Sequence, residues 1–292
     1  MNNFDIYADV AQRTGGDIYI GVVGPVRTGK STFVSQFMQQ VVLPNVNDQN
    51  EKQRAVDTLP QSADGKTVMT SQPKFVPDSG VEVKFNDQTK VKIRLIDCVG
   101  YMVDGAMGAM EDGKPRMVST PWQSEPIPMT EAAELGTKKV MEEHASIGIV
   151  VTTDGTITDI PRADYVQAER KAIEDIRATG KPFVTIINST DPMGEDAASL
   201  HRELKERYGI HAAIADCQAL TAEGCAALLQ DLLCAFPLGE LRVYLPGWAA
   251  ALEEDNPILV KLHAALLERC AAVQTLAQAE EELGKLSELA EI

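Results

Sequence analysis

Between Asp17 and about Leu245, short apolar runs alternate with segments in which apolar residues recur at helical spacing. This alternation predicts strand–helix–strand units arranged around a mainly parallel sheet. The expected strands are Ile18–Val23, Ile147–Val151 and Phe183–Ile187, with weaker candidates at Ile210–Ala215 and Leu241–Leu245. The expected helices between them are Lys30–Val42, Met129–His144, Asp164–Thr179, Asp196–Tyr208 and Thr221–Phe236.

Three further segments depart from this alternation. Gly80–Asp97 alternates apolar and polar positions on both sides of Asn86–Gln88, which predicts an antiparallel pair of strands with a turn between them. Tyr101–Pro128 is rich in Gly, Met and Pro, and we expect a large, nucleotide-responsive surface or a packed loop there. After Pro257 the helical spacing continues to Ile292. That segment is expected to be a linker helix into a further domain, a self-association surface or a helix packed on the sheet.

Composition and charge narrow the classes of protein to consider. The 292 residues are 44% hydrophobic and 24% charged, as is typical of a globular chain, which excludes a mainly disordered one. Asp and Glu number 43 against 27 Lys and Arg, and this net charge of −16 argues against general nucleic-acid binding. No apolar run approaches the ~20 residues of a membrane span, and Met1–Val10 has no basic residue, unlike a secretory signal. The five cysteines lack metal-ligand spacing and are expected to be reduced thiols.

Candidate chemistry begins in Gly24–Ser31, which satisfies the phosphate-loop pattern G-x-x-x-x-G-K-[ST] between a predicted strand and a predicted helix. Backbone amides of such a loop and the N-terminus of the helix attract phosphate. Lys30 would reach the β- and γ-phosphates, and the Ser31 hydroxyl would hold Mg²⁺. The expected nucleotide-binding residues of this segment are Gly24, Arg27, Thr28, Gly29, Lys30, Ser31 and Thr32.

A second apolar strand ends in Asp97 and is followed by Gly100. In a parallel sheet this places the Asp97 carboxylate beside the phosphate loop, where it holds Mg²⁺ through water. The backbone amide of Gly100 would then face the γ-phosphate. The next residue is Tyr101, where some switch proteins carry Gln, so the attacking water must be positioned by another group or by a second subunit.

Hydroxyl groups between these two motifs are candidates for sensing the γ-phosphate. The polar segment Lys66–Ser71 carries Thr70, Ser71 and Thr67, which we rank in that order. In P-loop switches a hydroxyl from this region completes the Mg²⁺ shell and responds to the γ-phosphate. Thr70 and Ser71 are therefore expected to act in catalysis with Lys30 and Asp97, and Thr70 to ligate the metal with Ser31 and Asp97.

The base of the nucleotide is less well defined by the sequence. Asn188-Ser189-Thr190-Asp191 follows a predicted strand where guanine-specific switches carry Asn-Lys-x-Asp. Without the Lys, no aliphatic stem packs on the purine, whereas Asp191 retains an acceptor for guanine N–H groups. Pro192 follows at once, so Asp191 is equally suited to opening a turn. Asn188 and Asp191 are candidate base contacts, and these residues leave ATP and GTP equally probable.

With these motifs in place, the chain resembles the N-terminal part of the stage IV sporulation protein A family of spore-forming Firmicutes. The likeness is dense up to about Asn188. It rests on Arg13–Tyr19, Val22–Thr32, Leu59–Ala63, Pro73–Pro77, Asp97–Tyr101, Pro115–Met117, Thr120–Trp122, Glu125–Pro128 and Thr152–Thr156.

The resemblance implies an ATPase that descends from switch GTPases and has lost their base-reading motif, which favours ATP although Asp191 keeps GTP open. It implies roles for Lys30 on phosphate, Asp97 on Mg²⁺ and Thr70 in sensing hydrolysis, with Ser71 as the second sensing hydroxyl. It also implies that hydrolysis drives self-assembly into a homopolymer beneath the spore coat. The implied place is the mother-cell cytoplasm, on the outer forespore membrane.

The implied partners are further copies of the chain, spore coat proteins and a small amphipathic protein of the forespore membrane, with no nucleic acid. Family members are longer, so the chain is expected to be a fragment or a diverged short form. The expected fold is a three-layer α/β P-loop NTPase domain, similar to switch GTPases, over residues 1–245. It has helices on both faces of its sheet and is followed by a helical segment at 246–292. The alternatives are a GTP-binding or weakly hydrolysing nucleotide switch and a purely structural coat protein.

Overall fold

The computed structural model describes residues 16–46, 48–60, 72–84, 90–111, 113–210, 212–240, 242, 244–245, 247–253, 255–271, 273–276, 278–279, 282 and 285. The chain divides into two compact units, Met1–Leu232 and Leu233–Ile292. The functional boundary expected after residue 245 stays a prediction.

The first unit is built on a six-stranded sheet in the order β10-β9-β8-β1-β3-β2. Its strands are β1 (Asp17–Val23), β2 (Lys74–Lys84), β3 (Lys90–Asp97), β8 (Ile147–Thr153), β9 (Phe183–Asn188) and β10 (Ala212–Ala215). Neighbours pair in parallel except β2 and β3, which are antiparallel as the alternation predicted. Val22 lies opposite Asp97 on one side and Ile149 on the other, so the ends of β1, β3 and β8 meet at one edge.

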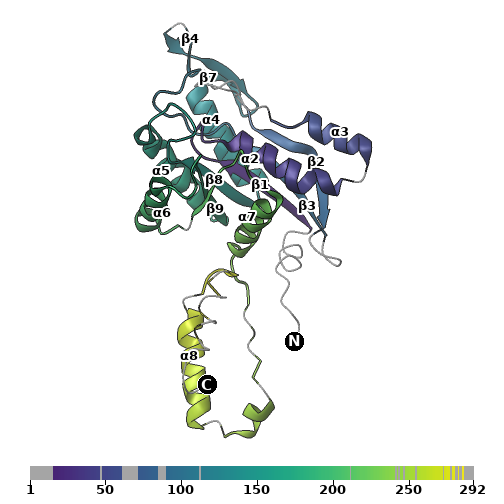
Figure 1. Ribbon diagram of the computed structural model, residues 1–292, viewed down its shortest axis with the longest axis vertical. Coiled ribbons are helices and arrows are strands. Elements are labelled where there is room, and N and C mark those ends of the chain that lie inside the picture. The colour runs from purple at the N-terminus through teal and green to yellow at the C-terminus, as the bar shows by residue number, and fades with distance from the viewer. Residues whose placement is uncertain are drawn as a thin grey trace. The chain divides into compact units, whose positions relative to one another are not determined.

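Helices cover both faces of this sheet, and the predicted three-layer α/β class is confirmed. They are α2 (Lys30–Phe37) with a π-helical continuation (Met38–Val42) and a 3-10 turn (Leu43–Asn45), α3 (Gln49–Asp57), α4 (Met129–Lys139) continued by Val140–His144, α5 (Arg162–Ala178), α6 (Glu195–Tyr208) and α7 (Ala222–Cys234). Figure 1 shows α2 and α7 on one side of the strands and α5 and α6 on the other.

The alternation of side chains along β1 explains the two cores. Ile18, Ile20 and Val22 are fully buried on one face, and α2, which buries Phe33 and Phe37, packs against β1 and β3. Full burial of such a side chain contributes roughly 1.5–3 kcal/mol. On the other face, a second buried cluster joins side chains of the sheet to α4, α5 and α6.

The pattern did not predict α3. This helix is polar, and Ala55 is its buried residue, so it lacks the apolar periodicity that identifies most helices. Its start is fixed by the Asp48 side chain, which accepts hydrogen bonds from the amides of Asn50 and Glu51.

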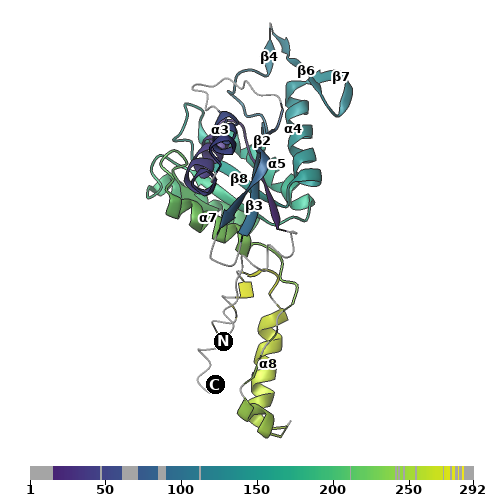
Figure 2. The ribbon, with the colours of Figure 1, turned by 90° about the vertical axis from the view of Figure 1, so that its right-hand side faces the viewer.

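The stretch Tyr101–Pro128 is also more regular than its composition suggests. It contains two short hairpins, formed by β4 (Met110–Glu111) with β5 (Lys114–Pro115) and by β6 (Met117–Thr120) with β7 (Gln123–Pro128). Figure 2 shows β4 at the top of the view and β6 and β7 beside the upper end of α4. Prolines within and beside the strands obscured their alternation in the sequence.

The second unit corrects two expectations. Helix α8 (Pro257–Ala271) ends well before Ile292, and after it Thr275 and Gln278 form a capping box in which each side chain accepts a hydrogen bond from the other residue's amide. This starts a new helical turn and interrupts the predicted long helix. The strand expected at Leu241–Leu245 is absent at residues 242, 244 and 245, the part of it that the structure describes. Among the residues that the structure describes, this unit also contains a 3-10 turn (Gly247–Ala251) and a bridge between Pro237 and Thr275.

A membrane-crossing helix was not expected. Across the described ranges, no helix is long and apolar enough to cross a bilayer. The five cysteines, all within those ranges, form no disulfide.

Candidate functional site

The phosphate loop connects the end of β1 to the start of α2. Gly29 caps the helix with a φ of 89°, and Gly24 opens the loop with a φ of 133°, both in the region that favours glycine. A Cβ at Gly24 would lie 2.2 Å from the backbone oxygen of Val151 in β8, so the loop rests directly on the neighbouring strand. The geometry is the predicted one, with a helix N-terminus at the carboxyl edge of the sheet.

Lys30 is the first residue of α2 and is 5% exposed. Its Nζ donates a hydrogen bond of 2.6 Å to the backbone oxygen of Pro25, which also accepts one of 3.0 Å from the Thr28 hydroxyl. Burial lowers the pKa of Lys30 to about 8, although the Asp97 carboxylate acts in the opposite direction. An ammonium group this poorly hydrated gains strongly from an anion, and backbone amides of a loop of this kind attract phosphate.

Ser31 and Asp97 lie together beside Lys30. The Ser31 hydroxyl donates a hydrogen bond of 2.7 Å to Oδ2 of Asp97, and Oδ1 of Asp97 is buried with no hydrogen-bond partner in the described structure. Burial raises the pKa of Asp97, while the Ser31 hydroxyl and the Lys30 ammonium oppose that shift. A buried carboxylate oxygen without a partner is costly unless a cation or water completes its contacts.

This pair fits a magnesium ion. Mg²⁺ prefers oxygen ligands and usually keeps waters while it binds substrate phosphates through one or two protein groups. Ser31 and Asp97 offer that donor set. Nowhere in the described ranges do three or more His, Cys, Asp or Glu residues cluster in a way that could hold a metal without a nucleotide.

Gly100 lies against both the phosphate loop and Lys30. Its φ is 96°, and a Cβ there would lie 2.3 Å from the backbone oxygen of Gly24 and 2.5 Å from Nζ of Lys30. Only glycine allows this approach. The structure therefore brings the predicted γ-phosphate contact next to the predicted phosphate-binding lysine. Arg27 (φ 64°) and Thr32 lie in the loop and in α2, in the same group of predicted residues.

Thr67, Thr70 and Ser71 lie outside the described residues, so their sensing role stays a prediction. The residues on either side of that segment are tied to the rest of the unit. Ser35 of α2 donates a hydrogen bond of 2.8 Å to the backbone oxygen of Pro60, and Gln72 donates one of 3.5 Å to that of Ser119 in β6.

At the base side, Asn188 acts as a clamp between loops. It is 4% exposed, its Nδ2 donates a hydrogen bond of 3.0 Å to the backbone oxygen of Thr28, and its Oδ1 accepts one of 3.0 Å from the amide of Cys217. It therefore joins the end of β9 to the phosphate loop and to the segment after β10. The sequence did not reveal the role of Cys217, because its backbone amide makes the contact with Asn188 and a backbone contact has no sequence motif.

Asp191 is separated from this clamp by a turn. It is exposed, its amide donates a hydrogen bond to the Ser189 hydroxyl, and its backbone oxygen accepts one from the amide of Gly194, just before α6. Ser189, which replaces the expected Lys, is fully buried and directs its hydroxyl to this turn. Base recognition by Asp191 stays a prediction.

The loop after β8 is a further component that the motifs did not reveal. The Thr156 hydroxyl donates a hydrogen bond of 2.7 Å to Asp154 and accepts one of 3.0 Å from the amide of Thr190. Ile157 lies 3.8 Å from the position of a Cβ at Gly29. The β8 loop thus lies between the phosphate loop and the base-side loop.

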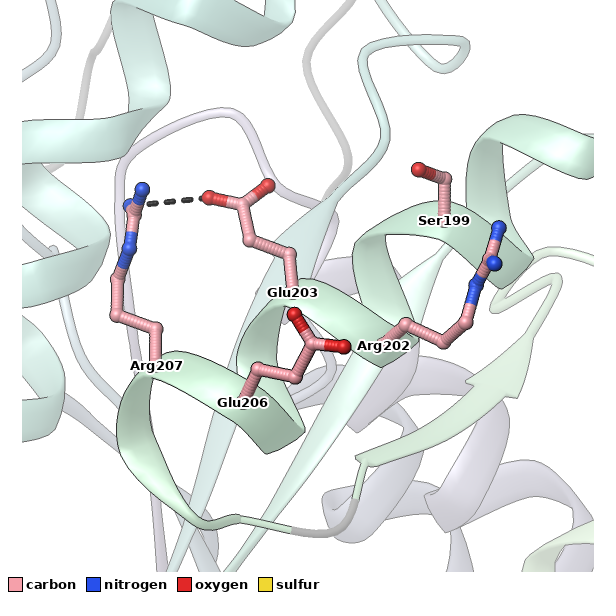
Figure 3. A pocket seen from close by; sticks show the side chains of 5 residues that line it. All are labelled: Ser199, Arg202, Glu203, Glu206 and Arg207. Atoms are coloured by element: carbon pink, nitrogen blue, oxygen red, sulfur yellow. Dashed lines mark ion pairs between the residues drawn. The ribbon is translucent and has the colours of Figure 1, made fainter.

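A separate surface depression of about 570 Å³ lies on α6 and is lined by Ser199, Arg202, Glu203, Glu206 and Arg207. Figure 3 shows that these side chains project from one helix, with Arg207 and Glu203 forming an ion pair of 2.9 Å. It contains none of the predicted nucleotide contacts and is an ordinary charged helix face.

Comparison with known proteins gives a consistent result. Residues 1–237 match the family model described as "Stage IV sporulation protein A, ATPase domain". Stage IV sporulation protein A of Bacillus subtilis (strain 168) is 45% identical over 288 residues, 99% of this chain and 58% of that protein. The protein of the same name from Bacillus anthracis is 48% identical over 256 residues, 88% of this chain and 52% of that protein.

The chain thus spans about half the length of the curated relatives it matches. Among solved structures, the crystal structure of an SsGBP variant is 13% identical and covers 77% of this chain and 58% of its own, with a TM-score of 0.41. That likeness is too weak for an argument about function.

Proposed function

The chain belongs to the stage IV sporulation protein A family and carries its ATPase domain, and we propose that it binds ATP with Mg²⁺ and hydrolyses it to drive its own assembly at the spore coat. The observation that supports this most directly is the group formed by Lys30, Ser31 and Asp97. A buried ammonium, a hydroxyl and a carboxylate with an unpaired oxygen meet at the end of a phosphate loop.

Phosphate binding would use the loop and Lys30. The loop amides and the N-terminus of α2 face the β-phosphate, and Lys30 exchanges its bond to the Pro25 carbonyl for the β- and γ-phosphates. The gain is large because the ammonium is buried and its competing partner is a neutral carbonyl.

Ser31 and Asp97 would hold Mg²⁺, Ser31 directly and Asp97 through water. When bound, the ion neutralises charge on the β- and γ-phosphate oxygens. The Ser31 hydroxyl donates its hydrogen to Oδ2 of Asp97, so its lone pairs are free to ligate a cation. Asp97 then serves as the fixed carboxylate that orients this hydroxyl or a water.

Hydrolysis would proceed by attack of a water on the γ-phosphorus, with the bond to the oxygen shared with ADP breaking, so that ADP and phosphate leave. The amide of Gly100 would stabilise the γ-phosphate oxygens. Thr70 and Ser71 are the hydroxyls proposed to complete the site and to report the loss of the γ-phosphate.

For the whole protein, the proposed role is a homopolymer that forms the basement layer of the bacterial spore coat, on the outer forespore membrane in the mother cell. The proposed partners are further copies of the chain, coat proteins and a small amphipathic membrane protein. The names of the relatives support a role in sporulation, and the polymer and its partners are our extension of it.

Steady-state phosphate release by the purified 292-residue chain, with ATP and with or without Mg²⁺, tests the activity. We expect Mg²⁺-dependent release that Lys30→Ala abolishes. We expect Thr70→Ala to retain ATP binding while losing hydrolysis and ATP-dependent sedimentation. Release by the wild-type chain no faster than by Lys30→Ala would refute the enzyme.

A second candidate is a GTP-binding or weakly hydrolysing scaffold. Asp191, which retains a carboxylate at the last position of the degenerate base-reading motif, favours this alternative. Competition of ATP against GTP for labelled nucleotide on the wild-type chain separates the two. Preference for GTP by about tenfold, a difference of about 1.4 kcal/mol, would support the GTP-binding form of the second candidate, and the phosphate-release assay tests the weakly hydrolysing form.

A further inference from the structure

Tyr101, which directly follows Gly100, is a buried tyrosine that the proposed chemistry does not use. It is 2% exposed, and its hydroxyl donates a hydrogen bond of 2.8 Å to Oδ2 of Asp175 in α5. The Lys171 ammonium, one turn earlier in α5, lies 6.0 Å from the centroid of the Tyr101 ring. Lys171 in turn forms an ion pair of 2.5 Å with Glu134 of α4. The side chain therefore ties the segment after β3 to α5, with α4 joined to the same group.

The backbone of Tyr101 faces the phosphate loop. Its amide donates a hydrogen bond of 3.1 Å to the backbone oxygen of Gly24, and its own oxygen accepts one of 2.7 Å from the amide of Val26. This forms an isolated parallel bridge between Pro25 and Tyr101. One residue is thus held on one side by the phosphate loop and on the other by a helix.

The phenol of Tyr101 is suited to a permanent bond and not to water activation. Burial raises its pKa, and the bond to Asp175 raises it further, so it stays protonated and donates to the carboxylate. Hydrogen bonds with an ionised partner are shorter and stronger than neutral ones. Since its hydroxyl is bonded to α5, it is not the group that orients the attacking water.

We propose that Tyr101 is a positioning residue that fixes the backbone of Gly100 beside Lys30, so that the Gly100 amide is in place for the γ-phosphate. This inference rests on the proposed ATPase function. In a switch protein in which the nucleotide orders the segment around Gly100, the nucleotide must stabilise that segment again on each cycle. Here the bonds to Gly24, Val26 and Asp175 hold the segment through the protein's own groups, and the part free to respond to hydrolysis begins after Tyr101.

The test compares Tyr101→Phe, which removes only the hydroxyl, with Tyr19→Phe. Tyr19 is a matched control because its hydroxyl also donates to a carboxylate, Oδ2 of Asp17, near the start of β1 at the opposite end of that strand from the phosphate loop. In the 292-residue chain, three quantities are measured for each variant: kcat for ATP, affinity for a non-hydrolysable ATP analogue, and affinity for ADP. Thermal unfolding midpoints report on the fold.

For Tyr101→Phe we expect kcat to fall about tenfold and analogue affinity about threefold, with ADP affinity unchanged within about twofold, because Gly100 contacts only the γ-phosphate. Tyr19→Phe should match the wild type in all three. Asp175→Ala should reproduce Tyr101→Phe, Asp175→Asn should restore much of the activity because it keeps an acceptor, and the double variant should show no added loss.

Two results would overturn the positioning role. One is an unchanged kcat and analogue-to-ADP affinity ratio in Tyr101→Phe. The other is an equal loss of analogue and ADP affinity together with a lower unfolding midpoint, which is a purely structural effect. A wild-type chain that binds ATP without hydrolysing it still tests the role through the affinity ratio. A wild-type chain that binds neither nucleotide refutes the proposed function itself.

Discussion

The phosphate end and the base end of the proposed nucleotide site are built in different ways. At the phosphate end, Lys30, Asp97 and Gly100 are buried, and each lies within contact distance of another member of the group or of the loop. At the base end, Asn188 is committed to tying loops together, while Asp191 is exposed in a turn that leads away into α6.

This difference shows where affinity and specificity arise. Phosphates are common to all nucleoside triphosphates and are bound by backbone geometry and buried charge, which are worth most where water is excluded. A base is read by a few side-chain donors and acceptors, and discrimination requires those groups to be buried and otherwise unpaired. We therefore expect tight phosphate binding with weak discrimination between bases.

The largest effect is expected from a substitution at the phosphate end of the site. Lys30→Ala removes the buried ammonium and should weaken ATP and ADP binding by at least about tenfold each, because charge-assisted bonds to the phosphates are lost. Equilibrium titration with a fluorescent ATP analogue measures this. Lys205→Ala, an exposed lysine of α6, is the control and should bind as the wild type does. Equal nucleotide affinity of Lys30→Ala and the wild type would refute the assignment of the phosphate site.

Asp97→Asn tests the same end of the site and separates the contribution of metal binding from that of phosphate binding. The amide cannot support a cation through water as a carboxylate does, so the increase in ATP affinity on adding Mg²⁺ should fall about tenfold or vanish. Affinity without Mg²⁺ should change little or rise, because a negative charge near the phosphates is gone. The comparison is titration with Mg²⁺ against titration in a chelator. Full Mg²⁺ stimulation in Asp97→Asn would place the metal elsewhere.

The pH dependence of binding follows from Lys30. Burial lowers the pKa of Lys30 from 10.5 to about 8, and the negative charge of bound phosphates must raise it. Affinity for ATP should therefore be insensitive to this group below pH 8 and fall above it, by up to about tenfold per pH unit, with proton uptake on binding. Lys30→Arg, whose guanidinium stays charged, should bind more weakly but without this slope. A wild-type slope of zero up to pH 9.5 would contradict the assignment.

The same shift has the opposite sign for folding without nucleotide. A lysine with a lowered pKa in the folded state destabilises the fold while it is protonated. That cost is fully present below pH 8 and is relieved as the pH rises from 8 towards 10.5, the value without burial.

Much of the fold was predictable because its strands are buried on both faces and its helices are amphipathic. The elements that escaped prediction lack that signal. Helix α3 buries little, the hairpins between Met110 and Pro128 are short and interrupted by proline, and the turn that restarts after α8 is marked by a two-residue capping box.

The candidate site divides in the same way. Lys30, Ser31 and Asp97 were predictable because their chemistry requires those residue types at fixed places between a strand and a helix. The clamp of Asn188 on the Cys217 amide and the bond from Tyr101 to Asp175 join positions far apart in the chain, through groups that no short motif specifies. Such contacts follow from the packing of the sheet and helices and could not be obtained from spacing.

The smallest expected effect concerns the base end. Asp191→Ala should change ATP affinity by less than about twofold, because an exposed carboxylate in a turn offers adenine no buried partner. GTP affinity is the sensitive quantity, since guanine presents N–H groups that a carboxylate accepts and adenine does not. Asp196→Ala, which removes an exposed carboxylate in the first turn of α6, is the matched control for the change in charge. A loss of GTP affinity of about tenfold in Asp191→Ala alone would show that the turn rearranges around guanine. The base-binding contacts would then form only when the nucleotide binds. The two ends of the site would differ in when their contacts form, and both would contribute to recognition.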